Sequence, residues 1–313
     1  MNQKRFSQIS LSGFGLLLFA LSLWTINNEL RQHNLSDVLR SLTEIPSNRL
    51  FIAIGCSIGG YLVLTSYDFL AFRYIRHSLP PNAIIFTAFI SHGVSNSVGF
   101  ALLTGGAIRY RLYSNWGVSV GAIAQVIAFE NLSFWLGLFA VSGIIFLLEP
   151  LTIPTLLNLP FVSVHPIGVI FLILVGAYLL GSYFYHQPLR IREQTFSFPS
   201  FRLSLKQIGI SLVDWGLAIA VLYLLLPPSI PLSYFGFAGI YLLAMIAGIV
   251  SNVPGGLGVF ETVILLLLPS EVTVPAALGS LIAYRGVYYI LPLTVAVVLL
   301  GLYEINQRLK ARS

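Results

Sequence analysis

The sequence predicts an all-α integral membrane protein: a polytopic helical bundle of about six full spans plus two broken helical hairpins. Of the 313 residues, 57% are hydrophobic and only 9% are charged, whereas soluble domains carry about 25% charged residues. So few charges cannot cover a water-facing surface, which excludes a soluble globular protein. The 22 Phe and 15 Tyr exclude disorder. Basic residues scattered at the edges of apolar runs indicate membrane anchoring rather than nucleic-acid binding.

Six apolar stretches are long enough to cross a bilayer, since a spanning helix needs about 20 residues. They cover residues 7–28, 50–72, 117–148, 166–185, 207–226 and 276–305. The first is expected to be a retained helix, because no small-residue cleavage site follows it. Segment 29–48 carries leucines at helical spacing, which predicts a short helix that either lies on the outer membrane surface or packs on the bundle.

Two further apolar stretches, 83–103 and 235–268, are interrupted by Gly, Pro, Asn and Ser. If the first crossed fully, segment 149–165, which has no Lys or Arg, would lie in the cytoplasm, and the basic segment 186–206 would lie outside. That arrangement contradicts the positive-inside rule. We therefore expect the first stretch to enter from the cytoplasm and turn back, which leaves both termini in the cytoplasm.

The two broken segments resemble each other. Each contains Val-Ser-Asn followed by a glycine-rich break, and Asn96 and Asn252 lie half a chain length apart. This spacing suggests one membrane domain, 1–313, whose halves, roughly 1–150 and 151–313, are inverted repeats. Paired breaks of this kind are typical of transporter binding sites, because non-helical backbone at membrane depth must line a cavity or be buried in protein. The alternative is that the glycines only kink a tightly packed bundle.

Charged residues within or beside the apolar segments are rare. They are Asp68, Arg109, Arg111, Glu130, Asp214, Glu261 and Arg285. Each costs about 2.5–3.5 kcal/mol at the centre of the bilayer, so each requires a partner or a function. Arg285 lies well inside an apolar run and is the best candidate to hold a phosphate, helped by Arg109 or Arg111. Those two arginines have the alternative role of cytoplasmic anchors.

The acidic residues in this set have several roles open. Glu130 and Glu261 are expected to pair with an arginine, to carry a proton or to receive a cationic headgroup. Asp68 and Asp214 are expected to be structural. His92, beside the first break, is expected to pack or to form a hydrogen bond, and the single Cys56 excludes an internal disulfide.

Four strings together resemble the lysylphosphatidylglycerol synthase transmembrane family. They are SNSVGFALLTGGAIRYRLYSNWGVS (95–119), FE (129–130), PGGLGVFE (254–261) and AYRGVYYILP (283–292). The resemblance implies a prokaryotic cytoplasmic (inner) membrane protein that moves a phospholipid, anionic or aminoacylated and similar to phosphatidylglycerol, between leaflets. It implies a site shaped by Asn96, Gly105, Gly106, Arg109, Arg111, Glu130, Pro254, Gly255, Gly256, Glu261 and Arg285, to which the second break adds Asn252.

We therefore expect a flippase-like transporter without catalytic residues. No GxxxxGK[ST] or HExxH motif occurs, so the sequence predicts neither a cofactor nor a metal. Two alternatives stay open: an intramembrane enzyme acting on a lipid-linked substrate, and a lipid-binding partner subunit without transport. Expected partners are the phospholipid and the bilayer, with a homo-oligomer or a synthase partner left open. No synthase domain follows the last helix, so the chain is either a stand-alone member or the membrane part of a longer protein.

Overall fold

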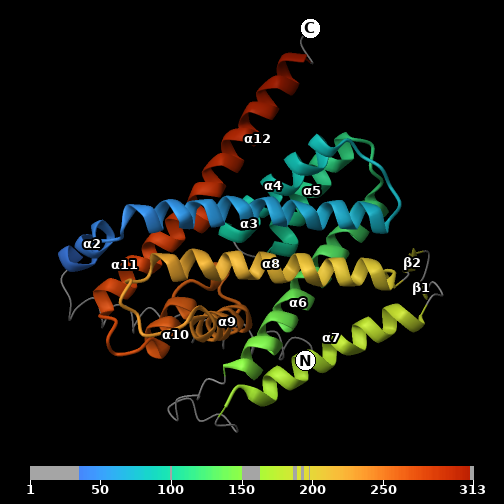
Figure 1. The fold of residues 1–313 in the computed structure, drawn as a ribbon. Helices are drawn as coiled ribbons and strands as arrows, with labels where there is room; N and C mark the ends of the chain where they lie inside the picture. The colour runs from blue at the N-terminus through green and yellow to red at the C-terminus, as the bar shows by residue number, and fades with distance from the viewer. Residues whose placement is uncertain are drawn as a thin grey trace, which may run out of the picture.

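The computed structural model describes residues 35–98, 101–149, 163–185, 189–191, 194–196 and 198–310. The predicted span at 7–28 lies outside these residues. The described part is a helical bundle with one short pair of strands (Figure 1). Its elements are α2 (Leu35–Thr43), α3 (Ser47–Tyr74), α4 (Pro81–Val98), α5 (Ala101–Asn115), α6 (Val120–Leu148), α7 (His165–Phe184), β1 (Leu189–Ile191), β2 (Gln194–Phe196), α8 (Phe201–Leu225), α9 (Tyr234–Val250), η2 (Pro254–Gly256), α10 (Val259–Leu267), α11 (Val274–Tyr284), η3 (Arg285–Ile290) and α12 (Leu291–Lys310).

Five helices in the described part are long and apolar enough to cross a membrane. They are Ser47–Tyr74, Val120–Leu148, His165–Phe184, Phe201–Leu225 and Val274–Gln307. These match the predicted spans that follow the first, so the predicted class, an all-α multi-span membrane bundle, is confirmed. The antiparallel strands β1 and β2 are a small local exception within the basic segment 186–206.

The antiparallel helices α3 and α8 form the centre of the bundle (Figure 1). Near the start of α3, Arg49 Nη2 donates to the carbonyl of Tyr223, near the end of α8, at 3.0 Å. Toward the end of α3, the Tyr67 hydroxyl donates to Ser211, in the first half of α8, at 3.0 Å. Helix α6 approaches α8 closely, because a Cβ atom on Gly137 would lie 2.5 Å from Ser211 Cβ, a separation that only glycine permits.

The two interrupted stretches form two helical hairpins, which we name the α4–α5 hairpin and the α9–α10 hairpin. In each hairpin the two helices pack against each other. The first hairpin follows the C-terminal end of α3, and the second follows the C-terminal end of α8. Because α3 and α8 are antiparallel, the hairpins begin at opposite ends of the bundle, as Figure 1 shows.

The break in the α9–α10 hairpin is built from residues with left-handed backbone. Asn252, Gly255, Gly256 and Gly258 have φ angles of 55°, 64°, 61° and 80°. Glycine adopts this conformation without steric cost, and Asn tolerates it better than most residues. Pro254, which cannot continue the preceding helix, opens the short turn η2 inside the break. The glycine-rich motif therefore ends α9 and reverses the chain.

The α4–α5 hairpin differs from the expected glycine-rich break. Helix α4 ends at Val98 and α5 begins at Ala101, so Gly105 and Gly106 lie inside α5 and not at the interruption. A Cβ atom on Gly105 would lie 3.2 Å from Ser95 Cβ in α4. The local role of Gly105 is therefore to let α5 approach α4 closely.

Helix α2 packs on the bundle, which is one of the two arrangements predicted for segment 29–48. Val38 is buried, and a Cβ atom on Gly279 in α11 would lie 3.0 Å from Ser41 Cβ. Arg40 of α2 and Glu44, which directly follows the helix, are exposed and pair with each other at 3.1 Å.

Candidate functional site

Four helices bring a group of charged side chains together inside the bundle. Asp68 comes from α3, His92 from α4, Arg109 and Tyr113 from α5, and Glu130 from α6. We name these five residues the Arg109 cluster. Asp68, Arg109 and Glu130 are only 0%, 3% and 9% exposed. Charges this deeply buried are tolerated only when they are paired.

Arg109 pairs with both carboxylates of the cluster. Its Nε donates to Asp68 Oδ1 at 3.1 Å and its Nη2 donates to Asp68 Oδ2 at 3.0 Å, which forms a two-point ion pair. The Tyr113 hydroxyl adds a third donor to Asp68 Oδ1 at 2.6 Å. The same Nη2 also donates to Glu130 Oε1. Asp68 thus receives three hydrogen bonds, whereas Glu130 shares its arginine nitrogen with Asp68.

His92 lies against both acidic residues. Its Nε2 is 3.3 Å from Glu130 Oε1 and 3.7 Å from Asp68 Oδ2, and 3.0 Å from Arg109 Nη2. Asp68, His92 and Glu130 are metal-ligating residue types whose ligand atoms lie within 4.8 Å of one another. The Arg109 guanidinium lies among these atoms, however, and a metal ion would add a second positive charge beside it. The arrangement therefore fits an ion-pair cluster better than a metal centre.

A second ion pair holds the break of the α9–α10 hairpin. Arg285 Nε donates to Glu261 Oε1 at 2.7 Å, and Arg285 Nη1 donates to the Gly255 carbonyl at 3.1 Å. The second carboxylate oxygen of Glu261 accepts from the Gly258 amide at 2.8 Å, which caps α10. We name Gly255, Glu261 and Arg285 the Arg285 site. The rings of Phe260 and Tyr289 lie 5.7 and 4.7 Å from the guanidinium carbon, within cation–π range.

Arg285 begins the π-helical turn η3, which side-chain hydroxyls fix in place. Three successive carbonyls of η3 each accept a hydrogen bond from α3 or α4. The bonds run from Ser57 to Val287 at 3.0 Å, from Tyr61 to Tyr288 at 3.1 Å and from Ser97 to Tyr289 at 3.0 Å. Single π-helical turns occur frequently at functional sites.

The two broken segments meet beside Arg285. Ser97, in the last turn of α4, reaches Tyr289 of η3. A Cβ atom on Gly255 would lie 3.8 Å from the Ser97 carbonyl oxygen. Asn96, half-buried, interacts through its side chain with the Tyr61 hydroxyl. The structure therefore brings Asn96 close to the Arg285 site, although they lie far apart in the sequence.

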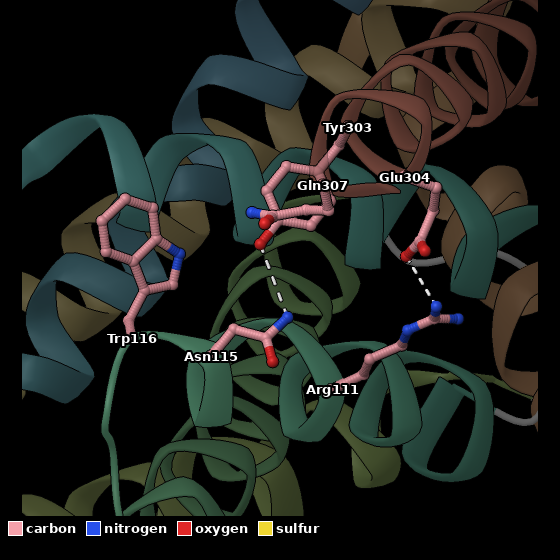
Figure 2. Close-up of a pocket in the computed structure, with 6 residues that line it drawn as sticks. All are labelled: Arg111, Asn115, Trp116, Tyr303, Glu304 and Gln307. Atoms are coloured by element: carbon pink, nitrogen blue, oxygen red, sulfur yellow. Dashed lines mark hydrogen bonds and ion pairs between the residues drawn. The ribbon is translucent and has the colours of Figure 1, made fainter. Parts of the chain in front are cut away.

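Arg111 does not share a site with Arg109. Residues two apart on a helix point in different directions, and Arg111 is exposed and pairs with Glu304 of α12 at 2.6 Å (Figure 2). It borders a pocket of about 560 Å³ lined by Arg111, Asn115, Trp116, Tyr303, Glu304 and Gln307. An exposed side chain at the edge of a surface pocket fits the alternative role of Arg111 as an anchor near the membrane surface.

Sequence reasoning assigned Asp68 and His92 no functional role, yet the structure places both in the Arg109 cluster. The sequence feature that could have indicated a role for both is the position of an ionisable residue inside an apolar helix. Asp214 of α8 lies nearby and accepts a hydrogen bond from Tyr67 at 3.1 Å. Its other oxygen, Oδ1, is buried and has no hydrogen-bond partner among the described residues.

Opposed hairpins, five candidate spans in the described part and buried ion pairs define a multi-span membrane protein with an internal charged site. The family model for the lysylphosphatidylglycerol synthase TM region matches residues 12–296. The chain belongs to this family, as the motifs predicted.

Relatives agree with this assignment. The chain is 49% identical to "Uncharacterized protein slr0712" of Synechocystis sp. over 310 residues, which cover 99% of this chain and 96% of the relative. It is 31% identical to the inner membrane protein YbhN of Escherichia coli, over 84% of this chain and 82% of the relative. It is 27% identical to a phosphatidylglycerol lysyltransferase of Staphylococcus xylosus, over 91% of this chain but only 33% of that enzyme. Bacterial inner-membrane proteins are thus among its relatives.

Proposed function

We propose that the protein moves a phospholipid between the leaflets of a bacterial cytoplasmic membrane and holds the lipid headgroup where the two hairpins meet. The observation that carries this proposal is the contact of Ser97 with Tyr289 and Gly255 beside Arg285. Segments from both halves of the chain thereby meet beside one arginine. A shared site between two opposed halves is typical of transporters that expose it to each side in turn.

Arg285 is the group proposed to bind the lipid phosphate. A guanidinium has five N–H donors, and the contacts with Glu261 and Gly255 engage each of its three nitrogens without using all five hydrogens. Arg285 can therefore donate a hydrogen bond to a phosphate oxygen while it keeps Glu261 as a partner. Its side chain is 17% exposed, compared with 4% for Arg109, so Arg285 is the more accessible arginine.

The arrangement of the two halves supports transport rather than bond-making chemistry. In the first half, Arg109 on a hairpin pairs with Glu130 on the next helix; in the second half, Glu261 on a hairpin pairs with Arg285 beyond the next helix. We propose inverted repeats over roughly 1–150 and 151–313, re-entrant hairpins, both termini in the cytoplasm and no enzymatic activity. The proposed substrate is an anionic or aminoacylated lipid similar to phosphatidylglycerol, because the lysyltransferase relative is named for that lipid.

A leaflet-resolved assay tests this function. Purified protein is reconstituted into vesicles with fluorescent phosphatidylglycerol, and a membrane-impermeant quencher reports the lipid that reaches the outer leaflet. Wild-type protein is expected to move the lipid faster than empty vesicles do, and Arg285→Gln is expected to lose most of that activity. Arg40→Gln, which removes an exposed arginine of α2, is the matched control and is expected to keep the wild-type rate of lipid movement. A folded wild-type protein that moves lipid no faster than empty vesicles would contradict the proposal.

A further inference from the structure

We propose that Glu130 is a proton-binding group, and that its protonation releases Arg109 to act, in addition to Arg285, as a donor to the anionic headgroup. This inference rests on the proposed function and adds a coupling ion to it. It begins from the composition of the Arg109 cluster, in which two carboxylates face one guanidinium. With a neutral His92 the buried cluster carries one uncompensated negative charge, and one added proton makes it neutral.

The hydrogen-bond geometry identifies Glu130 as the carboxylate that takes the proton. Asp68 holds both Nε and Nη2 of Arg109 and also the Tyr113 hydroxyl. These three donors stabilise its ionised form. Of the Arg109 nitrogens, Glu130 contacts only Nη2, which is already bonded to Asp68. Because hydrogen bonds to the ionised form of a carboxyl disfavour its protonation, the added proton goes to Glu130, which has fewer of them.

His92 gives that proton a second position. Nη2 of Arg109 has two hydrogens but lies within 3.0 Å of three groups that can accept one: Asp68, Glu130 and His92. A hydrogen on His92 Nε2 would resolve this shortage by pointing at Glu130 Oε1, 3.3 Å away. His92 is also the least buried of the charged or ionisable members, at 12% side-chain exposure. It can therefore pass a proton between Glu130 and the surroundings.

The helices around the Arg109 cluster each contribute a group that affects this proton. Helix α3 supplies Asp68, α4 supplies His92, and α5 supplies Arg109 and Tyr113. Helix α8 supplies Asp214, which interacts electrostatically with His92 and is held by Tyr67. Asp214 has no basic side chain within ion-pair distance among the described residues and is the main competing site for a proton.

The coupling step moves one proton and breaks no covalent bond. A proton from water binds the Glu130 carboxylate, directly or through His92, and the ion pair between Glu130 and Arg109 is lost. Nη2 of Arg109 is then able to donate to a phosphate oxygen while Asp68 still holds the guanidinium in place. When Glu130 returns the proton to water, the ion pair re-forms and the phosphate is displaced. Lipid binding and proton binding are thereby linked.

The transport experiment measures the rate of lipid movement between leaflets as a function of pH. In wild-type protein, the rate is expected to rise as pH falls, by at most about tenfold per pH unit, which is the limit for one proton. Glu130→Gln, which imitates the protonated carboxyl, is expected to flatten the profile. Glu44→Gln, at an exposed carboxylate just after α2, and Asp214→Asn are expected to keep the pH dependence. A flat wild-type profile overturns the inference, as does a profile that Asp214→Asn flattens and Glu130→Gln does not.

A second measurement does not depend on transport. Infrared difference spectra of the detergent-solubilised protein are recorded on acidification, where a protonated carboxyl gives its own C=O band. The inference requires such a band in the wild type and its loss in Glu130→Gln, with Asp214→Asn retaining it. If the wild type shows the Glu130 band but moves no lipid, the proposed function fails while proton binding stands. If folded Glu130→Gln loses none of the wild-type band intensity, the inference itself is overturned.

Discussion

At the scale of single residues, two arginines separated by one position have opposite surroundings. Arg109 is buried among carboxylates, and Arg111 lies at the surface beside Glu304. Loss of one partner from a buried ion pair leaves an uncompensated charge in a medium that solvates it poorly. An exposed pair is weakened by water and salt. The two positions therefore form a matched comparison of the same substitution.

Arg109→Gln is expected to destabilise the protein by about 3–5 kcal/mol, because Asp68 and Glu130 would lose their cation. Arg111→Gln is expected to cost less than about 1 kcal/mol. Thermal unfolding of the purified variants in detergent measures both effects. Asp68→Asn combined with Arg109→Gln should recover part of the loss, since it removes a stranded carboxylate. Equal destabilisation by the two arginine variants would show that Arg109 is not buried as described.

At the scale of elements, close helix contacts depend on particular glycines. A Cβ atom on Gly93 in α4 would lie 2.9 Å from Ala296 Cβ and 3.2 Å from the Pro292 carbonyl, both in α12. Backbone atoms of a packed helix cannot shift as a flexible side-chain end can. Gly55 in α3, in contrast, has nothing within 4 Å of such an atom.

Gly93→Ala is therefore expected to destabilise the packing of α4 on α12 by about 1–3 kcal/mol, the usual cost of overpacking. Gly55→Ala is expected to be neutral or to stabilise α3 by up to about 1 kcal/mol, because alanine favours helix more than glycine does. The unfolding temperatures of the two variants provide the measurement. Similar shifts in both would argue against the tight contact between α4 and α12.

At the scale of the whole molecule, the antiparallel pair α3 and α8 sets the directions of the hairpins. Ser78 lies in the exposed link before the α4–α5 hairpin, and Ser229 lies in the exposed link before the α9–α10 hairpin. With α3 and α8 both spanning the bilayer, these links belong to opposite sides of the membrane.

Single cysteines at the two links test this arrangement in a Cys56→Ala background. Ser78→Cys is expected to react with an impermeant maleimide only from the cytoplasmic side, and Ser229→Cys only from the outer side. Permeabilised membranes, in which both must react, serve as the control. Labelling of both cysteines from one side of intact membranes would rule out opposed hairpins.

Within the described residues, periodicity and composition predicted five spans and the two interrupted stretches that form the hairpins, because these features depend on local sequence. They also placed Glu261 beside the second break, where it pairs with Arg285. The contact of Asp68 and His92 with Arg109 was not predictable, since it depends on how three helices rotate against one another. The separation of Arg109 from Arg111 could have been predicted from their spacing of two residues on a helix. The helical position of Gly105 was missed because a glycine pair suits a close helix contact as well as a break.

The π-helical turn η3 also sets the rotational phase between α11 and α12. Each residue of an α-helix advances the chain by about 100° around the axis, and a π-helical turn contains an extra residue. Deletion of one residue within 285–290 would therefore rotate every side chain of α12 by about 100° relative to α11. Ala296 would turn away from Gly93, and part of the face of α12 that is now exposed would be directed into the bundle. The length of this six-residue segment thus decides which side of the last helix is inside.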